Sequence, residues 1–182
     1  TPTHKRQVPR SALRLQQEVT IAPRAADAST PRRFHMVASS GGIIRDHWYW
    51  GNFAVDLAGL NIGRQKRPAL YEHKKDRIVG FTDKIINTPE GLIAEGVFSA
   101  TPDGDKVQEL SDAGFPWEAS IYCPPDEVEE VGEGETAQVN GRTLTGPGAI
   151  FRKSRLREVS FAVLGADEDT PSAALSDQSD TV

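Results

Sequence analysis

The chain of 182 residues has one cysteine, Cys123, and no apolar run that approaches a membrane span, which takes about 20 residues. A single cysteine excludes an internal disulfide and argues against a cysteine-based zinc site. The four histidines lack the short spacings that place two metal ligands side by side, so a histidine metal site is not expected either. The N-terminal residues also lack the apolar core of a signal peptide. We therefore expect a cytoplasmic setting, with no metal and no contact with a membrane.

Aromatic residues make up only 7% of the chain, and none lies among the basic residues near the N-terminus. Residues 1–33 carry seven Lys and Arg against two acids, whereas residues 166–182 carry five acids and no base. Proteins that bind single-stranded nucleic acid place aromatic side chains beside basic ones, so nucleic acid is not an expected partner. We predict a basic, flexible N-terminal arm (1–33), a folded domain (34–165) and an acidic, flexible tail (166–182).

What the sequence does contain is a series of short alternating segments separated by turn residues. The segments "RFHMVAS", "RPALYEHKK", "DRIVGFTDKII", "GLIAEGVFSA" and "SRLREVSFAVLG" alternate as strands do, and the second places His73 within a strand. The four residues 87–90 predict a hairpin turn, and Asn140-Gly141 predicts another. The acidic, glycine-containing segment "DEVEEVGEGE" is expected to be a flexible loop.

One segment, "TPDGDKVQELSDAG", is predicted to be helical. Thr101 or Asp103 caps its start, Val107 and Leu110 form a short apolar stripe, and Gly114 ends it. The whole pattern gives seven or eight short strands and one or two short helices. It predicts a mainly β fold, with an antiparallel, closed or nearly closed barrel decorated with short helices.

The residues that carry chemistry are serines, and a catalytic serine needs a nearby base and a third group that orients the base. Ser120 lies mid-run in "DAGFPWEASIYCPPDE" but lacks the G-x-S-x-G turn of α/β-hydrolases. Ser160 in "REVSFAV" is an equally plausible serine by its local sequence. Cys123 lies three residues after Ser120 and so points to the opposite strand face, and we interpret it as a structural thiol.

Three segments in order resemble the prohead (capsid maturation) proteases of tailed phages, a family related in fold to the herpesvirus assemblins. They are "PALYEHKKDRIVGFTDKI", "GLIAEGVFSATPDGDKVQELSDAGFPWEASIY" and "LREVSFAVLGADED", and the resemblance covers residues 34–166. It implies an assemblin-like barrel in which Ser120 is the nucleophile, His73 the general base and Glu158 the group that orients the imidazole. "SIY" stands at Ser120 where the family usually has "SIG".

The resemblance leaves two parts of such a site open. Asp76 is the alternative to Glu158 for orienting the imidazole, although it lies only three residues from His73. By analogy with the assemblins, an arginine-bearing loop assists the oxyanion, and the candidates are Arg152, Arg155 and Arg157 in "FRKSRLRE".

The function implied by the resemblance is a serine endopeptidase that acts without a cofactor during phage prohead maturation. Its substrates would be the scaffold protein, the major capsid protein and its own flexible ends, inside the immature capsid in the host cytoplasm. Self-association is left open. The alternative is a catalytically inactive capsid-assembly or scaffold module built on the same barrel.

Overall fold

The computed structural model describes residues 19–24, 29–89 and 91–164, and it is mainly β, with 57% strand and 10% helix. The mainly β prediction is therefore confirmed. Among the described residues, no helix is both long and apolar enough to span a membrane. The predicted tail (166–182) and residues 1–18 of the predicted arm lie outside the described residues.

The described residues form more strands than the seven or eight predicted. They are β1 (Val19–Ile21), β2 (Arg33–Ser39), β3 (Ile44–His47), β4 (Gly51–Val55), β5 (Leu60–Asn61), β6 (Pro68–Tyr71), β7 (Lys74–Thr88), β8 (Gly91–Phe98), β9 (Glu118–Tyr122), β10 (Pro125–Val131), β11 (Thr136–Val139), β12 (Arg142–Thr145), β13 (Gly148–Arg155) and β14 (Glu158–Ala162), with a short 3-10 helix η2 (Leu57–Gly59) and the helix α1 (Pro102–Asp112). Strands as short as β5 were missed because two residues are too few for alternation to be recognised.

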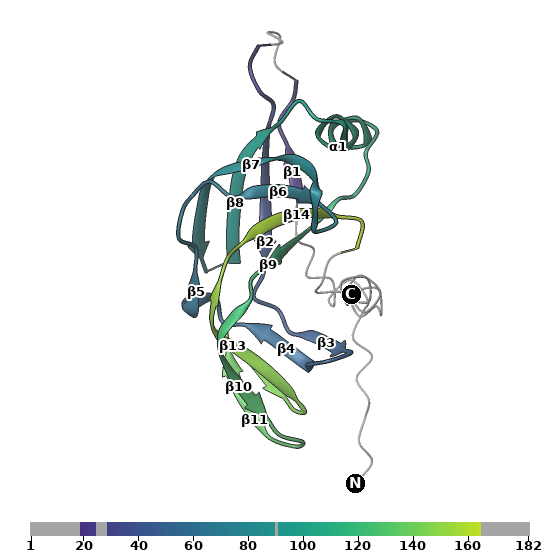
Figure 1. Ribbon diagram of the computed structural model, residues 1–182. Helices are drawn as coiled ribbons and strands as arrows, with labels where there is room; N and C mark the ends of the chain where they lie inside the picture. The colour runs from purple at the N-terminus through teal and green to yellow at the C-terminus, as the bar shows by residue number, and fades with distance from the viewer. Residues whose placement is uncertain (1–18, 25–28, 90, 165–182) are drawn as a thin grey trace.

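The larger sheet has seven strands in the order β1-β2-β8-β7-β6-β14-β9 and curls into a half-barrel (Figure 1). Its terminal strands are β1 and β9, so closure into the expected barrel is not confirmed. The sheet is also mixed, because β14 runs parallel to β6, which corrects the expectation of a purely antiparallel arrangement. Alternation within a strand reports its faces but carries no information on the direction of a partner far away in sequence.

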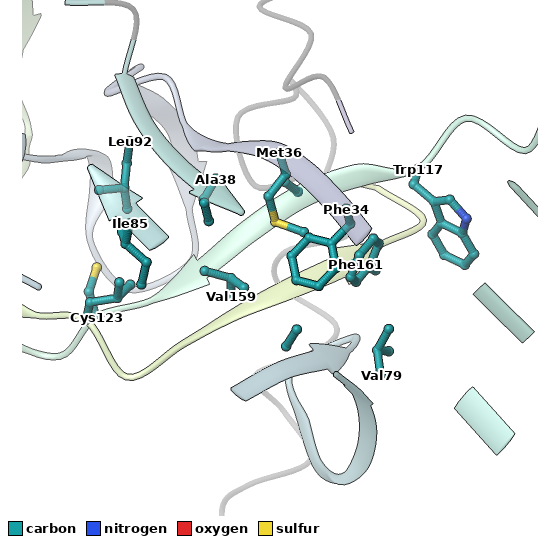
Figure 2. Close-up of a cluster of buried hydrophobic side chains, with 14 of the residues drawn as sticks. Phe34, Met36, Ala38, Val79, Ile85, Leu92, Trp117, Cys123, Val159 and Phe161 are labelled. Atoms are coloured by element: carbon teal, nitrogen blue, oxygen red, sulfur yellow. The ribbon is translucent and has the colours of Figure 1, made fainter. Parts of the chain in front are cut away.

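The core lies on the inner side of this curled sheet and brings together residues from both ends of the chain. Phe34 of β2 packs edge-on against Phe161 of β14, with ring centroids 5.2 Å apart. Met36 and Val159 belong to the same buried cluster (Figure 2). Since Val159 and Phe161 point into the core, Glu158, Ser160 and Ala162 must lie on the other face of β14.

The smaller sheet has the order β10-β13-β4-β3, with β5 pairing β13. The prediction of a flexible loop at "DEVEEVGEGE" was wrong in its first half, because β10 runs through residues 125–131 and pairs with β13. Basic side chains of β13 pair with acids of β10: Lys153 binds Glu127, and Arg152 binds Glu129. This cross-strand charge pairing explains how an acidic segment can form a strand.

Local signals predicted the helix and both hairpins correctly. Thr101 caps α1 by accepting a hydrogen bond from the Gly104 amide at 3.0 Å, and Gly114 follows the helix with a φ of 83°. β7 and β8 form the first hairpin, and β11 and β12 form the second around Asn140-Gly141. α1 packs against β7 and leads directly to β9, the strand that carries Ser120.

Candidate functional site

His73 lies in a tight turn between β6 and β7, and the prediction that it lies within a strand was wrong. Tyr71 pairs with Lys74, so Glu72 and His73 are the two central residues of a hairpin turn. Both have positive φ, 52° for Glu72 and 57° for His73. Such turns favour Asn and Gly, and because neither is present here, the sequence gives no local sign of the turn.

Three hydrogen bonds connect this turn to β14 and the residue that follows it. The Glu72 amide donates to the Phe161 carbonyl at 3.1 Å, and the Val163 amide donates to Glu72 Oε1 at 2.6 Å. The His73 amide donates to Ser160 Oγ at 3.1 Å. Backbone in the left-handed region costs free energy for residues other than glycine, and these contacts offset that cost and hold the imidazole beside β14.

Glu158 contacts the imidazole directly. His73 Nδ1 and Glu158 Oε1 are 2.6 Å apart, and Glu158 is only 6% exposed. Its second oxygen, Oε2, accepts a hydrogen bond from Ser160 Oγ at 2.6 Å. A buried carboxylate is stable only when its oxygens are hydrogen-bonded or paired with charge, and here each oxygen has a partner.

This contact determines which nitrogen of His73 can act as a base. An ionised carboxylate accepts hydrogen bonds and donates none, so Nδ1 carries the proton that Glu158 binds. Nε2 is then the nitrogen with a lone pair, and it can take a proton from a nucleophile. The pair thus has the geometry in which a buried carboxylate orients an imidazole.

Ser120 lies on the strand next to Glu158 and Ser160. β9 is antiparallel to β14, with Ser120 opposite Ser160 and Tyr122 opposite Glu158. Directly opposed residues share a sheet face and have Cα atoms about 4.5–5.5 Å apart. Ser120 thus faces the same side as the Glu158 carboxylate, whereas its neighbour Ala119 is buried in the core. Ser120 itself is only 5% exposed.

Of the three predicted site residues, two are in contact and the third lies on the neighbouring strand. His73 and Glu158 are in direct contact, and Ser120 is aligned with Ser160 one strand further on. Asp76, the alternative partner of the imidazole, lies on β7 and is exposed.

Cys123 is buried at one end of the core (Figure 2). The pKa of its thiol is raised to about 12, mainly by burial; the nearby Ser154 hydroxyl acts to lower it and the Glu158 carboxylate to raise it. A thiol with this pKa forms almost no thiolate at neutral pH, and the thiolate is the nucleophilic form. Cys123 therefore fits the structural role expected for it.

Two of the three arginines expected near an oxyanion are engaged elsewhere. Arg152 pairs with Glu129 and Asp56, and Arg155 pairs with Asp126 at 2.9 Å, all on the side of the smaller sheet. Arg157 is exposed, and its amide donates to the Tyr122 carbonyl. These contacts argue against Arg152 and Arg155 as oxyanion donors.

Ser160 is the site residue whose role the sequence did not reveal. Its hydroxyl contacts both Glu158 and the amide of His73. A signal was present, since Glu158 and Ser160 are polar residues at alternate positions of a strand that is buried along its whole length. Buried polar residues that share one strand face point to a hydrogen-bonded cluster.

Among the described residues, no group of three His, Cys, Asp or Glu side chains is placed to hold a metal ion. Comparison of the chain with models of protein families, with curated proteins and with solved structures finds no match. The interpretation of this site therefore rests on its geometry and on the order of its segments.

Proposed function

We propose that this protein is a serine endopeptidase of the prohead type, in which Ser120, His73 and Glu158 form the catalytic site. The observation that carries the proposal is the contact between His73 Nδ1 and the buried Glu158 carboxylate, on the strand paired with that of Ser120. The segments are 85 residues apart in the chain, so their meeting is a property of the fold and not of local sequence.

In the proposed reaction, His73 Nε2 takes the proton of Ser120 Oγ as the oxygen attacks the scissile carbonyl carbon. Glu158 holds Nδ1–H and stabilises the imidazolium that forms. The imidazolium then gives its proton to the leaving amine, and an ester between Ser120 and the acyl group remains. Water hydrolyses this ester with His73 again as base. General-base assistance of this kind contributes about 10²–10⁴-fold in rate.

The biological role follows from the resemblance of the three segments to prohead proteases. In this role the enzyme is enclosed in the immature capsid, where it cleaves scaffold protein and the major capsid protein. Its own ends are further substrates, because cleavage concentrates in chain termini. The assemblin-like fold belongs to the same proposal, supported by the curled sheet that carries the three residues.

Substitution of Ser120 by alanine tests the activity. We expect Ser120→Ala to abolish both covalent labelling by a fluorophosphonate probe and processing of co-expressed coat or scaffold protein, while circular dichroism stays unchanged. Ser154→Ala is the matched control, because Ser154 is equally buried but lies on β13. Full processing by Ser120→Ala would rule out Ser120 as the nucleophile.

One observation favours the alternative of an inactive assembly module. Ser120 is 5% exposed, and a substrate carbonyl has to reach its hydroxyl. The two functions differ in the labelling experiment, since only an activated hydroxyl reacts with the probe. Stoichiometric labelling mapped to Ser120 by mass spectrometry supports the enzyme, and complete absence of labelling supports the module.

A further inference from the structure

Ser160 is buried between Glu158 and His73 of the candidate site. It has 0% exposure and lies on β14 two residues after Glu158. Its hydroxyl donates to Glu158 Oε2 at 2.6 Å and accepts from the His73 amide at 3.1 Å. One side chain therefore contacts both the carboxylate and the backbone that carries the imidazole.

We propose that Ser160 is a positioning residue, which sets the orientation of the Glu158 carboxylate relative to the His73 ring. The inference rests on the proposed function, because positioning matters for the reaction only if His73 is its base. Ser160 acts through its two neighbours and has no covalent role.

The two hydrogen bonds restrict different motions of the pair. The bond to Oε2 restricts rotation of the carboxylate, so that Oε1 stays directed at Nδ1. The bond from the His73 amide fixes the backbone of a non-glycine residue in the left-handed region, with a φ of 57°. A hydroxyl is suited to this position because it donates one hydrogen bond and accepts others at the same oxygen.

Alanine at this position would remove both contacts at once. Glu158 Oε2 and the His73 amide would each lose a hydrogen-bond partner, so the carboxylate that holds the ring would be less firmly oriented. Small displacements of a catalytic group cost about 10²-fold in rate. Threonine keeps the hydroxyl and so retains the ability to form both contacts.

The experiment compares wild type, Ser160→Ala, Ser160→Thr and the buried control Ser154→Ala in the full chain. The first readout is inactivation by a fluorophosphonate probe, resolved into the affinity of the reversible complex and the rate constant of bond formation. We expect Ser160→Ala to lower the rate constant about 10- to 100-fold with affinity unchanged, and Ser160→Thr to recover most of the loss. Ser154→Ala should match wild type.

The second readout does not depend on catalysis. The His73 Nδ1–H proton bound to Glu158 should give a downfield, slowly exchanging NMR resonance, assigned by its loss in His73→Asn. We expect Ser160→Ala to move this resonance upfield or broaden it, and Ser154→Ala to leave it in place. Thermal unfolding of each variant establishes that the folded protein is being compared.

The outcomes separate the two proposals. If wild type does not react at Ser120, the proposed function fails, and the resonance alone decides the role of Ser160. If Ser160→Ala keeps both the wild-type rate constant and the wild-type resonance, the positioning role is overturned while the proposed function stands. If Ser160→Ala does not fold, the test rests on Ser160→Thr. Loss of both the rate constant and the resonance in a folded Ser160→Thr variant would also overturn the positioning role.

Discussion

Two hairpin turns of this protein have positive φ at both central residues but very different sequences. Glu72 and His73 have φ values of 52° and 57°, and Asn140 and Gly141 have φ values of 49° and 72°. Asn-Gly is the favoured pair for such a turn, whereas Glu is rare at positive φ and His, though more frequent there than most residues, lacks the freedom of Gly. The first turn adjoins the candidate site, and the second lies in a peripheral hairpin.

The polar side chains of the two turns are used differently. Asn140 bonds the backbone of other segments: its Oδ1 accepts from the Leu57 amide at 3.0 Å, and its Nδ2 donates to the carbonyls of Gly41 at 3.0 Å and Val55 at 2.7 Å. His73 directs its ring to the Glu158 carboxylate instead, and it is 36% exposed. The Asn140 side chain thus binds three backbone groups, whereas the His73 side chain contacts a buried carboxylate. Strained backbone of the kind found at Glu72 and His73 is concentrated at functional sites.

The largest expected effect is that of removing the His73 imidazole while keeping the geometry of its turn. Asparagine tolerates positive φ, so His73→Asn should keep the turn and the fold while removing the base. We expect the rate of labelling at Ser120 to fall by about 10²–10⁴-fold, with the thermal midpoint within a few degrees of wild type. Unchanged labelling in this variant would mean that the turn does not carry the base.

The next effect tests the structural turn. Asn140→Gly keeps a residue suited to positive φ but removes three side-chain hydrogen bonds, so we expect a loss of about 2–3 kcal/mol in the free energy of unfolding. Urea denaturation measures this loss, and labelling at Ser120 should stay within twofold of wild type in the folded protein. A large loss of labelling at Ser120 in folded Asn140→Gly would contradict the view that only the His73 turn supports the reaction at Ser120.

The smallest expected effect concerns Cys123, the buried thiol interpreted as structural. Because burial raises the pKa of the Cys123 thiol to about 12, the native protein should react very slowly with iodoacetamide at pH 8. Cys123→Ala should cost about 1 kcal/mol from lost packing and leave labelling at Ser120 unchanged. Rapid alkylation of the native protein, assessed against urea-unfolded protein, would overturn this view of Cys123.

Prediction from the sequence succeeded where a short segment carries its own structural signal. The Asn140-Gly141 hairpin, the Thr101 cap and the alternation of β14 were recognised because each depends on residues within a few positions. His73 was assigned to a strand because its turn lacks the usual residues. The strand at 125–131 was missed because basic partners on β13 stabilise its acidic side chains, and those partners come later in the chain.

The sequence by itself determined that the chain is mainly β and that Glu158 and Ser160 share one strand face while Val159 and Phe161 share the other; the structure shows that Val159 and Phe161 face the core. Only the tertiary structure decided that the Glu72-His73 turn lies against the face of Glu158 and Ser160, because β6 pairs in parallel with β14. Pairing between distant strands depends on how the whole core packs, and no local pattern encodes it. The contact of His73 with Glu158, and the place of Ser160 between them, exist for that reason.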